Sequence, residues 1–167
     1  NLMVSGVEGG FTRLQPEGTV VRIFEATQEY LTRNTPLVIV AGKNYGCGSS
    51  RDWAAKGVAL VGAKAVIAES FERIHRANLV GMGVLPLQFE PGTSIASLRL
   101  DGSETFDISG LDAEFAVQAT ARCTIVRSDG TRTEIPLTIR LDTPDDISYW
   151  RHGGILPFVW REYMSND

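Results

Sequence analysis

The chain has 167 residues, of which 43% are hydrophobic and 22% are charged, and its formal net charge is −4 at pH 7. This length and apolar content predict one domain with a sizeable core. The negative net charge excludes the broad basic surface that binds nucleic acid, but it is compatible with a local basic pocket for a small anion.

The cysteines and histidines of the chain are few and scattered. Cys47 and Cys123 form no CxxC pair, and the only histidines are His75 and His152. This spacing predicts no metal site within the chain, so we expect any metal to be held by residues outside it. No apolar run reaches the roughly 18 residues that span a bilayer, and no basic-then-apolar leader opens the sequence. We therefore expect a cytoplasmic, reducing location, and the absence of an initiator Met before Asn1 leads us to expect a fragment of a longer protein.

The segment 36–90 alternates between buried apolar runs and helical patterns. Three strands are expected, over residues 36–41, 64–68 and 84–89. Two helices are expected between them, one from the N-cap candidates at 49–52 to Gly62 and one over 71–80. Strands that alternate with helices favour a parallel α/β core with right-handed crossovers, which binds ligands at the carboxyl ends of its strands. The loop 46–50 follows such a strand end.

After Pro91 the pattern changes to alternating strands that are typical of antiparallel hairpins. These strands are expected over residues 97–100, 105–108, 119–126 and 133–141, with turns at Asp101-Gly102 and Asp129-Gly130. Thr143 is expected to cap a short helix, and a last helix is predicted over 155–163. The predicted fold class is thus α/β, with a parallel α/β core followed by antiparallel hairpins and C-terminal helices.

The loop after the first of these strands reads Gly46-Cys47-Gly48-Ser49-Ser50-Arg51. A dinucleotide fingerprint needs a third glycine at the position of Arg51, and a phosphate-binding loop needs Gly-Lys-Ser/Thr, so the spacing excludes both. What remains is a glycine loop that brings two hydroxyls and a guanidinium to a helix N-terminus, where negative charge is favoured. A serine before a helix is most often only a cap, but capping accounts for one serine alone. The second hydroxyl and the bidentate fork of Arg51 indicate a carboxylate site.

Several neighbouring side chains have simpler interpretations than catalysis. Cys47 could sense redox conditions or contribute to a cluster, but a small side chain between two glycines explains its position as well. We interpret His75 and His152 as hydrogen-bonded structural groups. Arg73 and Arg76 could face an interdomain surface, but we interpret them as part of a solvated helix face.

Several segments closely resemble the swivel domain of the aconitase family, in the branch of bacterial aconitases and iron-regulatory proteins. The segments are Tyr45-Gly46-Cys47-Gly48-Ser49-Ser50-Arg51-Asp52-Trp53-Ala54-Ala55-Lys56-Gly57, 65–76 and 78–87, together with the tail segments 140–143 and 149–156. Between residues 91 and 139 the resemblance is only topological. It implies the aconitase-type swivelling β/β/α fold, with residues 1–167 forming the C-terminal domain of a larger enzyme.

The resemblance also implies roles for individual residues. In that family the first serine of the Gly-Ser-Ser-Arg motif is the catalytic base, which assigns this role to Ser49. Ser50 and Arg51 would bind substrate carboxylate, and a further family arginine matches Arg13, which follows Asn1-Leu2-Met3 and Gly6. The full-length enzyme would carry a 4Fe–4S cluster as the Lewis acid for the leaving hydroxyl, with its cysteine ligands outside this chain. We therefore expect the isolated chain to be inactive.

The activity that the resemblance implies is that of aconitate hydratase, a lyase of the tricarboxylic acid cycle that interconverts citrate and isocitrate through cis-aconitate. Two alternatives within the same family are dehydration of 2-methylcitrate or 2-methylisocitrate and the role of an isopropylmalate isomerase small subunit. A non-enzymatic alternative is RNA binding by a cluster-free form, against which the acidity of the chain argues. The expected partners are a tricarboxylate substrate and the remaining domains of the same polypeptide, and no membrane is expected to be one.

Overall fold

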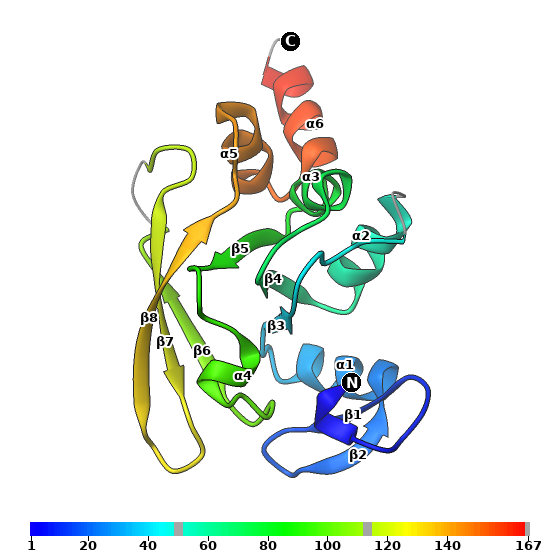
Figure 1. The fold of residues 1–167 in the computed structure, drawn as a ribbon. Coiled ribbons are helices and arrows are strands. Elements are labelled where there is room, and N and C mark those ends of the chain that lie inside the picture. The colour runs from blue at the N-terminus through cyan, green and yellow to red at the C-terminus, as the bar shows by residue number, and fades with distance from the viewer. Residues whose placement is uncertain (49–51, 112–114, 166–167) are drawn as a thin grey trace.

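The computed structural model describes residues 1–48, 52–111 and 115–165. The chain begins with a 3-10 turn η1 (Leu2–Val4), the antiparallel hairpin of β1 (Phe11–Leu14) and β2 (Thr19–Arg22), and the helix α1 (Ile23–Thr32). Figure 1 shows this hairpin packed beside α1 at one end of the molecule. The sequence patterns above predicted none of these elements.

A six-stranded sheet with the order β3-β4-β5-β8-β7-β6 forms the body of the molecule. Its parallel half consists of β3 (Leu37–Ala41), β4 (Ala63–Ala68) and β5 (Leu85–Phe89). The helices α2 (Asp52–Leu60) and α3 (Arg73–Gly81) connect these strands. The predicted alternation of short apolar strands and helices is therefore confirmed. It follows from β-branched runs such as Val38-Ile39-Val40, whose side chains fit a sheet that is covered on its faces.

The other half of the sheet is antiparallel. It consists of β6 (Thr105–Ser109), β7 (Thr120–Val126) and β8 (Arg132–Ile139), and β8 pairs with β5 so that Leu87 lies opposite Ile139. The turn between β7 and β8 is the expected one, since Asp129 Oδ1 accepts a 2.8 Å hydrogen bond from the Thr131 amide. The prediction of antiparallel strands after Pro91 is thus confirmed for three of its four segments.

The predicted strand over residues 97–100 is wrong. The segment forms the short helix α4 (Ile95–Leu98), and Arg99 ends it in a left-handed conformation. The helix begins in a capping box, in which Ser94 Oγ accepts from the Ser97 amide at 3.1 Å and Ser97 Oγ accepts from the Ser94 amide at 2.8 Å. These two bonds satisfy amides that a strand would have paired elsewhere, so local capping prevails over the alternating pattern.

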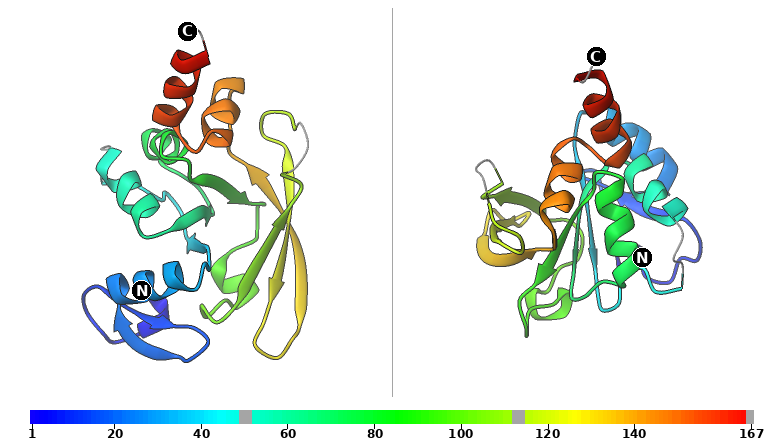
Figure 2. Two further views of the ribbon diagram at one scale, coloured as in Figure 1. Left: turned by 180° about the vertical axis from the view of Figure 1, so that it is seen from behind. Right: turned by 90° about the horizontal axis from the view of Figure 1, so that it is seen from above.

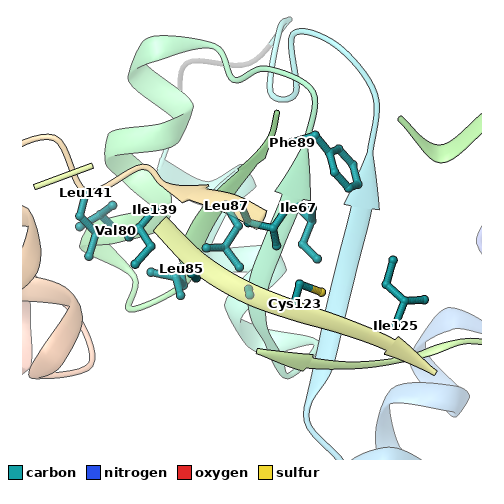
Figure 3. Close-up of a cluster of buried hydrophobic side chains, with 12 residues drawn as sticks. Ile67, Val80, Leu85, Leu87, Phe89, Cys123, Ile125, Ile139 and Leu141 are labelled. Carbon is teal, nitrogen blue, oxygen red and sulfur yellow. The ribbon is translucent and has the colours of Figure 1, made fainter. Parts of the chain in front are cut away.

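Two clusters of buried side chains hold the sheet together. The larger cluster joins both halves of the curled sheet: Ala65, Ile67, Val80, Leu85, Leu87, Phe89, Ala121, Cys123, Ile125, Leu137, Ile139 and Leu141 (Figure 3). The smaller cluster lies on the opposite face of β4, where Val66 packs with Ala55 of α2 and Leu79 of α3. The helices α2 and α3 are therefore fixed to one face of the parallel strands, as Figure 2 also shows.

The chain ends in α5 (Pro144–Arg151) and α6 (Ile155–Ser165), close to the predicted bounds. Thr143 caps α5 as expected, since its Oγ1 accepts from the Asp146 amide at 3.1 Å. Among the helices of the described ranges, none combines the length and apolar character needed to cross a membrane.

Arg76 of α3 is not on a solvated face, so that interpretation is wrong. Only 9% of the residue is exposed, and its Nη1 donates to the Arg140 carbonyl and to Asp146 Oδ2, each at 2.9 Å. Its Nε lies 3.3 Å from Asp142 Oδ2. Because these partners follow β8, the periodicity of α3 alone could not reveal them. Arg73, in contrast, is exposed as expected.

Candidate functional site

The loop 42–48 lies at the carboxyl end of β3, next to the loop 69–72 at the carboxyl end of β4. The two loops are joined by backbone hydrogen bonds from Glu69 N to Gly42 O (3.1 Å), from Tyr45 N to Ser70 O (2.9 Å) and from Glu72 N to Tyr45 O (2.9 Å). Ser70 Oγ also accepts from the Asn44 amide at 2.7 Å. This pairing extends the parallel register of the two strands into the loops, which fixes the path of the loop from Gly42 to Tyr45.

Beneath this loop lies the side chain of His75, from the first turn of α3. His75 is 2% exposed, and its ring meets the Tyr45 ring edge-on at 5.2 Å between centroids and an angle of 66°. The Tyr45 ring in turn meets the Phe71 ring edge-on, with 6.1 Å between the centroids. A Cβ atom built on Gly46 would overlap the Cβ, Cγ and Cδ2 atoms of His75, so only glycine allows the loop to lie this close to the ring.

The two glycines of the motif differ in their surroundings. Gly46 and Gly48 both have positive φ angles, of 91° and 99°, which a residue with a side chain rarely adopts. A Cβ atom on Gly48 would meet no heavy atom within 4 Å. Glycine is therefore required at position 46 by both the positive φ angle and the close packing of His75. At position 48 it is required by the positive φ angle alone.

Burial and local hydrogen bonds shift the pKa values of the groups under the loop. Burial lowers the pKa of His75 despite the opposing charge of Glu72. Glu72 caps α3, and the backbone amides of His75 and Ile74 lower the pKa of its carboxyl group. Burial also raises the pKa of the Tyr45 hydroxyl. At neutral pH the loop thus rests on a neutral imidazole and a neutral phenol.

An open hollow of about 430 Å³ lies at the same edge of the sheet. It is lined by residues that follow β3, β4 and β5 together with the start of α4, including Lys43, Ser70, Glu90 and Ser94. In parallel α/β sheets ligands bind outside the carboxyl ends of the strands. The loop 42–48 forms one side of this edge, as predicted.

Three of the four predicted site residues, Ser49, Ser50 and Arg51, lie outside the described residues. The fourth, Arg13, lies in β1, on the hairpin beside α1 (Figure 1). Its Nε donates to the Met3 carbonyl at 2.8 Å and its Nη1 donates to the Gly18 carbonyl at 3.1 Å. In this structure Arg13 joins the hairpin to η1, and its role as a substrate ligand stays a prediction.

The sequence did not indicate the contact between His75 and Gly46. His75 was expected to be hydrogen-bonded, but neither ring nitrogen has a hydrogen-bond partner among the described residues. His152 does match that expectation, since its Nδ1 lies 2.8 Å from the Ser148 carbonyl oxygen. The sequence showed the glycines of the loop but not their neighbour, because His75 comes from a different element.

No cluster of metal-ligating side chains occurs in the parts of the chain that the structure describes. Cys47 is exposed and Cys123 is buried, and both are free thiols. Burial raises the pKa of Cys123 to about 11, which opposes the thiolate form that metals bind. The described residues thus offer no set of ligands for an iron–sulfur cluster.

Comparison with known proteins identifies a family and several curated relatives. The profile of the aconitase C-terminal domain matches residues 1–92. Aconitate hydratase A of Corynebacterium jeikeium is 51% identical over 99% of this chain, and that of Pseudomonas aeruginosa is 51% identical over 98%. A 2-methylcitrate dehydratase (2-methyl-trans-aconitate forming) of Shewanella oneidensis is 48% identical over 96% of this chain. The chain spans only 18% of the length of each of these relatives.

A comparison with solved structures supports the fold. The crystal structure of a 3-isopropylmalate dehydratase from Methanocaldococcus jannaschii superposes with a TM-score of 0.51 and 20% sequence identity. The match covers 87% of this chain and 81% of that chain. The predicted swivel-type α/β fold is therefore confirmed.

Proposed function

Since the chain belongs to the aconitase C-terminal domain family, we propose that it is the C-terminal swivel domain, over residues 1–167, of a hydro-lyase of the aconitate hydratase type. The whole enzyme would interconvert citrate and isocitrate through cis-aconitate. The remaining domains of the same polypeptide would complete its active site. A cytoplasmic location stays a prediction.

The observation that carries this proposal is how the described residues on either side of Ser49, Ser50 and Arg51 are held. The loop 42–48 is hydrogen-bonded to 69–72 and rests on His75, and α2 begins at Asp52. Ala55 of α2 is fully buried against Val66 and Leu79, which holds the helix in place. Packed residues on both sides of a loop suit a group that has to meet its substrate in one defined orientation.

In the proposed mechanism Ser49 is the catalytic base. It would remove a weakly acidic proton bound to carbon, which a serine can do only as an alkoxide stabilised by nearby cations and N–H dipoles. Arg51 and the N-terminal end of α2 would supply that stabilisation. Ser50, Arg51 and Arg13 would bind the carboxylates of the substrate, and Arg13 would have to exchange one of its two carbonyl contacts or use its remaining nitrogen.

The 4Fe–4S cluster of such an enzyme would be held by residues outside this chain. The described residues contain no set of ligands for it, and Cys47 alone cannot supply one. When bound in the whole enzyme, the cluster would supply the Lewis acid for the departing hydroxyl. This chain would contribute the base and the contacts to carboxylate.

A second candidate substrate is 2-methylcitrate, because the relative from Shewanella oneidensis is 48% identical to this chain. An additional methyl group changes binding by only about 1–3 kcal/mol, so one pocket outside this chain could decide between the two substrates. Turnover of citrate and of 2-methylcitrate by the whole polypeptide, measured side by side, distinguishes them.

The experiment that tests the proposal is steady-state kinetics of the whole polypeptide carrying Ser49→Ala, with cis-aconitate formation followed by absorbance. Loss of a general base should lower kcat by about 10²-fold to 10⁴-fold or more and leave KM nearly unchanged. Arg51→Lys should instead raise KM and lower kcat together, because a point charge replaces a bidentate fork.

Cys47→Ser is the matched control, because Cys47 is an exposed residue of the same loop. It should keep kcat within about 2-fold of the unchanged enzyme if the thiol has no catalytic part. Near-normal kcat in Ser49→Ala would refute the assignment of the base. An unchanged KM in Arg51→Lys would mean that Arg51 does not contact substrate.

A further inference from the structure

Five large apolar side chains form a continuous stripe on α6. Their exposed fractions exceed one half: Leu156 77%, Val159 54%, Trp160 66%, Tyr163 66% and Met164 60%. Their spacing of i, i+3, i+4, i+7 and i+8 puts them on one side of the helix. Single exposed apolar residues are ordinary, but a contiguous stripe of this kind marks an interaction surface. We call these five residues the α6 stripe.

The opposite side of α6 already attaches the helix to the rest of the chain. The Phe158 ring lies 5.2 Å from that of Tyr149 and 5.1 Å from that of His152, centroid to centroid. Arg161 Nη1 donates to the His152 carbonyl at 2.8 Å. Figure 2 shows α6 at the periphery, with α5 on one side of it. The α6 stripe is therefore not needed to attach the helix.

We propose that the α6 stripe docks against another domain of the same polypeptide. This inference rests on the proposed function, because it requires that the chain be one domain of a longer enzyme. The relative from Corynebacterium jeikeium aligns over 99% of this chain, α6 included, yet only 18% of its own length takes part. Most of that polypeptide lies outside the match and is available to cover the stripe.

The size of the stripe favours an attached domain over a second copy of this chain. A stable complex of separate proteins needs about 20–30 residues on each side, whereas the α6 stripe has five. A covalently linked domain meets the stripe at an effective concentration of the order of millimolar, so a small apolar contact is enough to hold it. The occupant we infer is thus a domain on the same polypeptide, with an apolar surface that receives Trp160.

Hydroxyl-radical footprinting of the whole polypeptide tests this docking, with oxidation of Trp160 and Met164 measured by mass spectrometry. The urea-unfolded polypeptide gives the reference rate. A covered stripe should be oxidised at least about 10-fold more slowly in the native state, whereas the open stripe of the isolated chain would stay within about 2-fold of the reference. Native rates within that 2-fold range would overturn the inference.

Two lysine variants on α6 sharpen the test. Trp160→Lys introduces a charge into the stripe and should raise native Met164 oxidation about 5-fold or more. Ser165→Lys introduces the same charge at an exposed position outside the stripe and should leave that rate unchanged. Equal rates in both variants would overturn the inference.

The test also separates docking from dimerisation and from the proposed activity. Footprinting at two protein concentrations with molar mass by light scattering would overturn the inference if protection appeared only in dimers. Turnover of citrate is measured on the same samples. Protection without turnover supports the docking and refutes the proposed function, whereas turnover without protection refutes the docking alone.

Discussion

Gly46→Ala should destabilise the chain more than any other single-methyl change in the motif loop. At φ 91° an alanine costs about 1–2 kcal/mol of backbone strain. Its Cβ atom would also overlap the His75 ring, and moving that ring inside a packed site costs about 1–3 kcal/mol more. We therefore expect a loss of about 2–5 kcal/mol in the free energy of unfolding, measured by urea titration followed by circular dichroism.

Gly48→Ala is the matched control, because its φ of 99° imposes the same strain while its Cβ atom meets nothing within 4 Å. It should cost only about 1–2 kcal/mol. The double variant Gly46→Ala/His75→Ala should recover about 1–3 kcal/mol relative to the sum of the single variants, since the ring that obstructs the methyl group is gone. Equal losses for Gly46→Ala and Gly48→Ala, with no coupling to His75, would show that the loop does not rest on this ring.

Three further predictions concern pH, the buried ion pairs and the isolated chain. Because burial lowers the pKa of His75, the folded chain binds fewer protons than the unfolded chain, so stability should fall as the pH drops below about 6.5, and His75→Gln should remove this part of a urea-titration pH profile. If His75→Gln left the pH dependence of stability unchanged, this prediction would be contradicted. Arg76→Met should cost about 3 kcal/mol, because Asp146 loses its cation while Asp142 keeps only Arg140, at 3.2 Å. Arg122→Met, which loses an exposed pair at 4.0 Å, should cost less than about 0.5 kcal/mol. Equal losses of stability in the two variants would contradict the buried, ion-paired role of Arg76. The isolated chain should form no cis-aconitate and should bind citrate only in the millimolar range, with NMR shifts at the amides of 46–51, so turnover or shifts confined to distant residues would count against the proposed site.

Local patterns in the sequence predicted most of the sheet. The apolar run before Gly42 and the Asp129-Gly130 turn act through neighbouring residues, and the structure has the strands where these signals lie. The helix α4 was missed because the capping box of Ser94 and Ser97 outweighs an alternating pattern of only four residues. Short segments of this kind are decided by side-chain hydrogen bonds as much as by apolar spacing.

The interior of the candidate site could not be read from local patterns. Gly46 lies in the loop after β3 and His75 lies in α3. Their contact depends on the parallel pairing of β3 with β4. Arg76 is similar, since its partners Asp142 and Asp146 come from the other end of the chain. Before the fold was known, the hydroxyls and Arg51 of the glycine loop indicated a carboxylate site, and the resemblance to a family implied the reaction.

The antiparallel pairing of β5 with β8 limits where this chain can be truncated. The family profile ends at residue 92, just beyond β5, but the free edge of β5 is covered by a strand made some fifty residues later, with Phe89 opposite Leu137. A piece cut at the profile boundary would keep all three parallel strands and leave Leu85, Leu87 and Phe89 on an unpaired, apolar edge. Such an edge pairs with other chains, so residues 1–92 on their own would be prone to aggregate. A fragment that is to fold without this exposed edge therefore has to include β8.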